Sequence, residues 1–278
     1  MRFLASIVLL FLAGLMPGSF FAPVTAAYAC GVETDCVMGD RTYRIRMPEG
    51  HDGKTRIGAL VFMHGYKGSA AGTMRNANLA RVADELGVAL IAPKSAGNDW
   101  DLPGVPRNTK STGENEFRYF EALIADVSKH FPIDTERLVA TGFSAGGMMV
   151  WNLACHRGHL FAGFAPLSGT FWDPIPDTCP SAPVHLIHMH GTSDPVVPLA
   201  GRAIVDTSQG DVLEAMALFA TAGGFERESP SDVLDLKCKR RTNADKRILE
   251  LCLHAGGHRF SADYLLRAWE EFRKAGAL

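Results

Sequence analysis

Short apolar runs separated by polar segments recur along the chain, and they predict the strands of a buried sheet. Residues 57–63 and 88–92 are apolar throughout, as is typical of strands covered on both faces. Residues 41–47 instead alternate polar with apolar side chains before Pro48, which predicts a half-exposed antiparallel strand at a sheet edge. Further strands are predicted at 137–141, 161–167, 184–189, 233–238 and 247–253.

Segments with helical periodicity lie between these strands. The clearest covers residues 115–131, where large apolar residues recur every three to four positions and form one buried face. Further helices are predicted at 78–86, 145–154, 211–222 and 261–274. Residues 94–113 and 171–176 show neither pattern, and the first of these loops is expected to line a ligand crevice. Strands alternating with helices predict an α/β fold with a mostly parallel central sheet and helices on both faces.

The sequence Gly142-Phe143-Ser144-Ala145-Gly146 joins a predicted strand to a predicted helix. It matches G-x-S-x-G, in which a sharp strand-to-helix turn exposes a nucleophilic serine. Gly142 and Gly146 would let neighbouring backbones approach where a Cβ would clash. An ordinary glycine-rich turn is the alternative, but the strand-turn-helix context favours Ser144 as a nucleophile.

A serine hydroxyl needs a histidine base, and the histidine needs a carboxylate that fixes its tautomer. In this type of fold the order along the chain is serine, acid, histidine, each after a strand. Asp194 fits the acid, because it follows the predicted strand at 184–189. A turn-forming aspartate before Pro195 is the alternative. Competing carboxylates that do not directly follow a buried strand are Asp173, Asp206 and Asp211.

His258 fits the base, because Gly256-Gly257-His258 follows the predicted strand at 247–253 and precedes a helix. His254 is the rival, but it still lies at the strand end. The sequence therefore predicts a triad of Ser144, Asp194 and His258. The oxyanion of an acyl-transfer reaction also needs two backbone donors. We expect these to be the N–H groups of Ala145 and of Tyr66, with Lys67 as the second choice in that loop.

Histidines and tryptophans supply the other candidate site residues. His185, His188 and His190 crowd one predicted strand, but a strand face offers too few ligands for a metal, so we interpret them as core or loop histidines. Trp100 and Trp172 lie in the crevice loops and are expected to line a substrate pocket. Trp151 belongs to the helix after Ser144 and is expected to pack in the core. Residues 237–241 are interpreted as a solvated hairpin edge.

The first 29 residues are typical of a secretory signal peptide. Arg2 precedes a nearly continuous apolar run at 3–15, and Ala27 and Ala29 suit cleavage before Cys30. Cleavage after Ala27 is an alternative. A membrane anchor is disfavoured, because the run is shorter than the ~20 residues that a span needs. Residues 30–278 are then expected to form a single catalytic domain that is secreted to the periplasm or the medium. The net charge of −2, without basic or acidic blocks, does not indicate a nucleic-acid partner.

Six cysteines remain after export, and an even count in an exported chain predicts three disulfides. Pairing between neighbours along the chain gives Cys30–Cys36, Cys155–Cys179 and Cys238–Cys252, one of several possible connectivities. Lipidation of Cys30 is the alternative, disfavoured by Tyr28 and by the loss of a partner for Cys36. The sequence contains no C-x-x-C motif, so no zinc site is expected.

Together these motifs resemble the esterase lineage of the α/β-hydrolase superfamily that contains polyhydroxybutyrate depolymerases and carbohydrate esterase family 1 feruloyl esterases. The matching segments are 64–68, 142–147, 190–198 and 256–258, in the order of that family. The resemblance implies a secreted serine esterase that needs no cofactor. Separately, we expect the protein to be a monomer. Its implied substrates are hydroxyalkanoate esters or oligoesters, with feruloyl or acetyl-xylan esters as the alternative. A catalytically silent hydrolase-fold binding protein is the rival from another class.

One departure concerns the substrate. Arg259-Phe260 follows the predicted catalytic histidine, where many relatives have a tryptophan nearby, and the chain carries no additional substrate-binding domain. Both features favour soluble oligomers or small esters over solid polymer.

Overall fold

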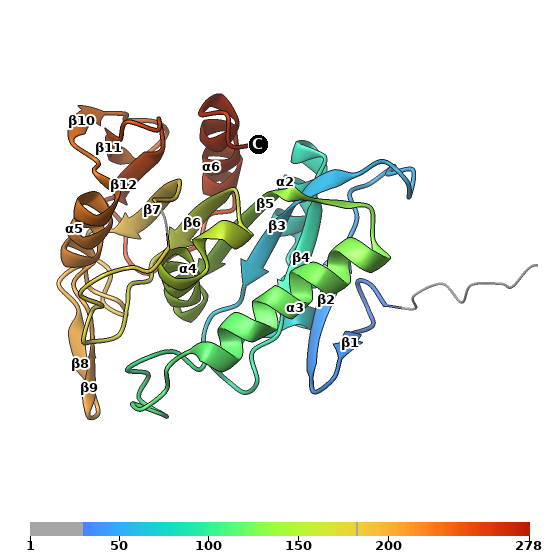
Figure 1. The fold of residues 1–278 in the computed structure, drawn as a ribbon, viewed down its shortest axis with the longest axis horizontal. Helices are drawn as coiled ribbons and strands as arrows, with labels where there is room; N and C mark the ends of the chain where they lie inside the picture. The colour runs from blue at the N-terminus through green and yellow to red at the C-terminus, as the bar shows by residue number, and fades with distance from the viewer. Residues whose placement is uncertain (1–29, 182) are drawn as a thin grey trace, which may run out of the picture.

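A computed structural model describes residues 30–181 and 183–278, so the predicted signal peptide at 1–29 lies outside the described residues. The described chain forms a 10-stranded sheet and a separate two-stranded hairpin (Figure 1). In sheet order the strands are β1 (Cys36–Met38), β2 (Arg41–Arg46), β4 (Ala89–Pro93), β3 (Ile57–Met63), β5 (Ile133–Phe143), β6 (Gly163–Leu167), β7 (Leu186–Gly191), β12 (Ile248–His254), β11 (Lys237–Thr242) and β10 (Arg227–Pro230).

The centre of the sheet is parallel, as the apolar runs predict. Strands β4, β3, β5, β6, β7 and β12 run in the same direction, and antiparallel strands flank them on both sides. Parallel strands need crossover connections, and helices lie in those from β3 to β4, from β4 to β5 and from β5 to β6. The carboxyl ends of β3, β5, β7 and β12 therefore meet at one edge of the sheet.

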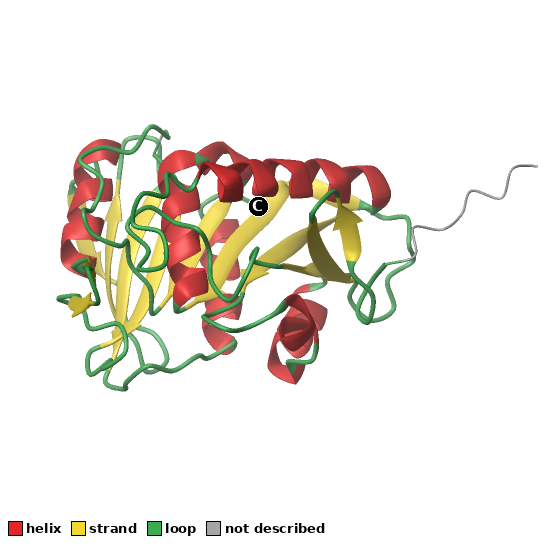
Figure 2. Ribbon diagram, turned by 90° about the horizontal axis from the view of Figure 1, so that it is seen from below, coloured by secondary structure: helices red, strands yellow, loops and turns green. Residues whose placement is uncertain are grey.

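Helices cover both faces of the sheet, and each layer has its own apolar core (Figure 2). One face is covered by α3 (Glu114–His130), α4 (Ala145–His156) and α5 (Val212–Gly223), and the other by α1 (Ala70–Met74), α2 (Ala77–Leu86) and α6 (Asp263–Lys274). A single 3₁₀ turn, Gly158–Leu160, follows α4. The predicted α/β architecture is therefore confirmed. None of the described helices has the length and apolar character needed to cross a bilayer.

Two strand predictions at the sheet edges are wrong. β2 is not an edge strand, because β1 pairs with its outer side. The strand predicted at 233–238 is displaced, since Val233 and Leu236 form only an isolated bridge and the ladder begins at Lys237. Residues 237–241 are consequently not an edge, because β11 lies between β10 and β12.

Several elements carry no periodic signal in the sequence. The hairpin of β8 (Arg202–Ile204) and β9 (Thr207–Gln209) lies in a segment without an apolar pattern, and Figure 1 draws it apart from the main sheet.

Asp211, a rival for the catalytic acid, accepts hydrogen bonds from the Leu213 and Glu214 N–H groups at 2.6 and 3.2 Å. It therefore caps the start of α5.

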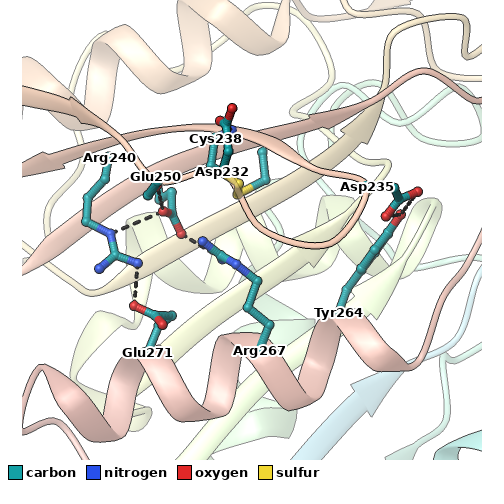
Figure 3. Close-up of a disulfide and its surroundings, with 10 residues drawn as sticks. Asp232, Asp235, Cys238, Arg240, Glu250, Tyr264, Arg267 and Glu271 are labelled. Carbon is teal, nitrogen blue, oxygen red and sulfur yellow. Dashed lines mark hydrogen bonds and ion pairs between the residues drawn. A yellow bond between two sulfur atoms is a disulfide. The ribbon is translucent and has the colours of Figure 1, made fainter.

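The six cysteines form the three pairs predicted from the sequence: Cys30–Cys36, Cys155–Cys179 and Cys238–Cys252. The last pair joins directly opposite residues of β11 and β12. Beside it, the buried Glu250 binds Arg267 of α6 at 2.8 Å and Arg240 at 3.1 Å (Figure 3). This ion-pair network fixes α6 to the sheet. Because α6 begins just after the loop that carries His258, the network also supports that loop.

Candidate active site

Ser144 occupies the sharp turn between β5 and α4. Its backbone has φ 59° and ψ −122°, a conformation that non-glycine residues rarely adopt. The Ser144 N–H donates to the Leu167 carbonyl of β6 at 3.0 Å, which fixes the turn against the sheet. A Cβ on Gly146 would lie 2.0 Å from the Met63 carbonyl oxygen. Only glycine fits there, as the sequence motif predicts, and the close packing of α4 on β3 depends on it.

Asp194 lies in the loop after β7, and its side chain is fully buried. Hydrogen bonds reach both of its carboxylate oxygens. One oxygen, Oδ1, accepts hydrogen bonds from the Val196 and Val197 N–H groups, both at 2.8 Å. The other, Oδ2, accepts from Nδ1 of His258 at 2.7 Å. The carboxylate therefore has a fixed orientation, with one oxygen for its own loop and one for the imidazole.

Two opposing effects set the pKa of Asp194. Burial alone would raise it, because a charged carboxylate is poorly solvated inside the protein. The hydrogen bonds from Val197, His258 and Val196 outweigh burial, and the pKa is lowered from its ordinary value. Asp194 is therefore ionised at neutral pH and can stabilise a positive charge on the imidazole.

His258 lies in the loop after β12, next to the Asp194 loop. The two loops are joined by backbone hydrogen bonds, one of them from the Thr192 N–H to the His254 carbonyl at 2.9 Å. The imidazole ring lies against Phe143, the residue before Ser144, with ring centroids 4.5 Å apart. Of the predicted triad, the structure joins Asp194 and His258 by a hydrogen bond.

The structure does not join the other half of the predicted triad. Among the described residues, no hydrogen bond links the Ser144 hydroxyl to Nε2 of His258, although the ring lies beside the elbow. Hydrogen bonds between catalytic groups are often long in an enzyme without substrate and shorten when substrate binds.

Arg259 anchors the His258 loop, a role that the sequence pattern does not reveal. Its guanidinium donates to the Tyr264 hydroxyl of α6 at 2.8 Å and to Nδ1 of His254 at 3.3 Å. It also binds the Asp235 carboxylate, which lies in the turn before β11. The rival base, His254, is thus engaged in supporting the loop, since it also accepts from the Gly256 N–H at 3.0 Å.

The loop after β3 contains the two residues considered for the second oxyanion donor, Tyr66 and Lys67. The Lys67 N–H donates to the Asn98 carbonyl at 2.7 Å and is already occupied. In the described part of the chain, the Tyr66 and Ala145 N–H groups have no acceptor, and both residues line the cavity that contains Ser144. The structure therefore favours Tyr66 over Lys67 as the second oxyanion donor.

Trp100 does not line this cavity, which corrects its predicted role as a pocket residue. It is fully buried, and its indole N–H donates to the His64 carbonyl at 2.9 Å. His64 Nε2 in turn accepts from the Ser95 N–H at 3.2 Å. Burial lowers the pKa of His64, so the ring stays neutral in this network. The hydrogen bonds of Trp100 and His64 thus stabilise the loop that carries Tyr66.

A cavity of about 630 Å³ opens beside Ser144, a size that suits a small organic ligand. Its walls come from the 94–113 loop, from Trp172 and from the β8–β9 hairpin. Trp172 lines it, in agreement with the position predicted from the sequence. Asp99, Arg107, Arg202 and Gln209 also line it, and no sequence motif indicated these residues.

His188 and His190 are fully buried, as expected for core histidines. His190 Nε2 donates to the Val197 carbonyl at 2.7 Å, so its Nδ1 accepts from His188 Nε2 at 2.9 Å. Burial lowers the pKa of both rings, so they remain neutral. His190 therefore supports the turn that binds the Asp194 carboxylate. Within residues 30–181 and 183–278, the one group with metal-ligand spacing is Cys238, Glu250 and Cys252, whose sulfurs are joined to each other.

The chain resembles known proteins in sequence and in fold. The chain is 26% identical over 267 residues to the putative esterase NocK of Nocardia uniformis subsp. tsuyamanensis, covering 85% of this chain and 75% of that protein. It is 26% identical over 196 residues to feruloyl esterase C of Emericella nidulans, covering 65% of this chain and 67% of the relative. The solved acetyl xylan esterase from Aspergillus awamori superposes with a TM-score of 0.59 at 15% identity, over 83% of this chain and 94% of that one.

The structural likeness at that level of identity shows the α/β-hydrolase fold. The sequence model of one family, described as phospholipase/carboxylesterase, matches residues 51–218. That range holds more than half of the chain and includes Ser144 and Asp194. The chain is an ester hydrolase and belongs to the phospholipase/carboxylesterase family of the α/β-hydrolase superfamily.

Proposed function

We propose that the enzyme cleaves carboxylic esters with Ser144 as nucleophile, His258 as general base and Asp194 as the group that orients the base. The observation that carries this proposal is the 2.7 Å hydrogen bond from His258 to Asp194, next to a serine with a strained backbone at a strand-to-helix turn. The Asp194 hydrogen bond holds the proton on Nδ1 of His258. The lone pair of Nε2 then remains available to accept the proton of Ser144.

The reaction proceeds in two steps. In the first, Ser144 Oγ attacks the ester carbonyl while its proton moves to His258, and the Tyr66 and Ala145 N–H groups stabilise the oxyanion. The protonated His258 then donates its proton to the leaving alcohol, and an acyl-enzyme remains on Ser144. In the second step water attacks this ester, again with His258 as base, and the released serine regains a proton from it.

We propose small or oligomeric hydroxyalkanoate esters as the substrates. The cavity of about 630 Å³ beside Ser144 supports this, because it is larger than a short acyl group requires. Hydroxycinnamoyl esters are the second candidate, favoured by the relatives named feruloyl esterase C and by the aromatic wall that Trp172 provides. Cleavage of acetyl esters would leave most of the cavity to the alcohol.

We also propose that the protein is exported and consists of a single catalytic domain after removal of residues 1–29. Three disulfides within residues 30–278 support export, because such bonds persist in oxidising compartments. Intact mass of the protein purified without reducing agent tests this. Export predicts a chain that begins at Cys30 or Tyr28 with all six thiols oxidised, and a retained leader or free thiols would contradict it.

Activity on a substrate panel tests the reaction and the residues together. We expect wild type to hydrolyse hydroxybutyrate oligomers, methyl ferulate or short p-nitrophenyl esters, and to be labelled by a fluorophosphonate at Ser144. Ser144→Ala should abolish both, whereas Ser128→Ala, a partly exposed serine on α3 that does not line the cavity, should leave them unchanged. Wild-type hydrolysis by Ser144→Ala would refute the nucleophile assignment, and an unlabelled wild type would favour a binding protein.

A further inference from the structure

Gln209 carries a buried polar atom that has no hydrogen-bond partner in the described part of the chain. It is the last residue of β9, it is 5% exposed, and it lines the same cavity as Ser144. Its Oε1 is buried without a hydrogen-bond partner among the described residues. Buried acceptors in native proteins are almost always paired, so an unpaired one beside a candidate active site indicates a missing partner.

The position of Gln209 is fixed by its backbone. It pairs with Arg202 across the hairpin and forms a bridge to Trp172. A Cβ on Gly201 would lie 2.0 Å from the Gln209 carbonyl oxygen, so the hairpin packs closely at this residue. The Thr207 hydroxyl also donates to the Gly104 carbonyl at 2.8 Å, which ties the hairpin to the 94–113 loop. Gln209 therefore belongs to a well-supported part of the cavity wall.

The other groups of the cavity restrict what the partner can be. Asp99 offers a second acceptor, since the Trp100 N–H at 2.9 Å engages only its Oδ1. Arg107 and Arg202 line the same space, and two guanidinium groups disfavour a cationic donor such as an ammonium. A hydroxyl group is a neutral donor, so it can donate to these acceptors without placing a positive charge beside the two guanidinium groups. The remaining walls, which include Val105, Met148 and Ile204, are apolar.

We propose that Gln209 Oε1 accepts a hydrogen bond from a hydroxyl group of the ester substrate and thereby selects hydroxylated esters. This inference rests on the proposed function, because it assigns specificity to the cavity of the same site. The hydroxyl can belong to a hydroxyacyl chain, to a phenolic acyl group or to the alcohol. These sources share one chemistry, and matched substrates distinguish them.

The test compares kcat/KM for three pairs of esters in which one hydroxyl is replaced by a methyl group. The pairs are methyl β-hydroxybutyrate and methyl isovalerate, methyl p-coumarate and methyl p-methylcinnamate, and ethylene glycol monoacetate and propyl acetate. We expect wild type to prefer the hydroxylated ester of at least one pair by at least about tenfold, since an unpaired buried polar group penalises the analogue. The preferred pair identifies the source of the hydroxyl.

Gln209→Met keeps the side-chain length and removes the acceptor, so it should reduce that preference to within about twofold, mainly by slowing the hydroxylated ester. Ser208→Ala, on the same strand but outside the cavity lining, should retain the wild-type preference. Fluorophosphonate titration normalises each variant to its active fraction. No preference in any pair, or a preference that Gln209→Met preserves, would overturn the proposal. Failure of the proposed function is a different result, in which wild type cleaves no ester.

Discussion

Asp194→Asn tests the orientation of the catalytic base with little change in shape. The Val196 and Val197 N–H groups both donate to Oδ1, so the asparagine must place its carbonyl oxygen there. Its NH₂ group then faces Nδ1 of His258, where Oδ2 now accepts. The favoured imidazole tautomer becomes the one with the proton on Nε2. That tautomer cannot accept the proton of Ser144.

The size of the effect follows from the cost of restoring the reactive tautomer. In that state two buried donors face each other, and leaving each unsatisfied costs about 1–3 kcal/mol. The sum of about 2–6 kcal/mol corresponds to a loss of roughly 30-fold to 20,000-fold in kcat. Loss of the carboxylate charge, which stabilises the imidazolium, places the expected value toward the upper end, near the ~10⁴-fold known for this substitution in serine protease triads.

Hydrolysis of p-nitrophenyl butyrate measures this loss at neutral pH, with thermal unfolding as the control for folding. We expect an unchanged melting temperature within a few degrees, because both backbone hydrogen bonds of residue 194 remain. Asp206→Asn changes an exposed carboxylate of the hairpin and should keep activity within about twofold. A folded Asp194→Asn enzyme that loses less than about fivefold in kcat would refute the assignment of Asp194.

Three further substitutions test the packing and electrostatics of the structure. Gly146→Ala would place a Cβ 2.0 Å from the Met63 carbonyl, so we expect a loss of activity beyond ~100-fold with a lower melting temperature; near-normal kinetics would contradict the close packing. Burial raises the pKa of Asp99 to about 6 from its usual 3.8, so the folded state binds this proton more tightly and its stability falls as pH rises from about 4 to about 6. Asp99→Asn should therefore gain up to about 3 kcal/mol in urea unfolding at neutral pH and nothing at about pH 3, and an equal effect at both pH values would be inconsistent. Glu250→Ala leaves the buried Arg267 without its carboxylate, so urea unfolding should show a loss of about 3–5 kcal/mol, and a loss below 1 kcal/mol would argue against the network.

The central sheet was predictable because its strands are buried on both faces and therefore read as apolar runs. Residues 57–63 form β3 with the predicted bounds, and the helix predicted at 78–86 ends at Gly87 in the left-handed conformation. The outer strands were missed in the sequence analysis for a physical reason. β1 and β10 are short and partly solvated, so their composition does not distinguish them from loops. Only the pairing with a neighbour makes them strands.

The candidate site divides in the same way. Ser144, Asp194 and His258 could be named because each follows a predicted strand in a fixed chain order. Gln209 and Asp99 could not, because their positions depend on how a hairpin and a long loop fold over the sheet edge. Arg259 was visible in the sequence only as a departure from relatives. Its link to Asp235 and Tyr264 depends on tertiary contacts that no local pattern encodes.

The hairpin of β8 and β9 shares no ladder with the main sheet. In the proposed mechanism the reacting residues follow strands of the main sheet, whereas Gln209, the proposed specificity residue, lies on the separate hairpin. The hairpin can therefore be lengthened, shortened or exchanged without altering the strands that position the proposed triad. Libraries confined to residues 202–209 are accordingly the natural starting material for redirecting this enzyme to new esters.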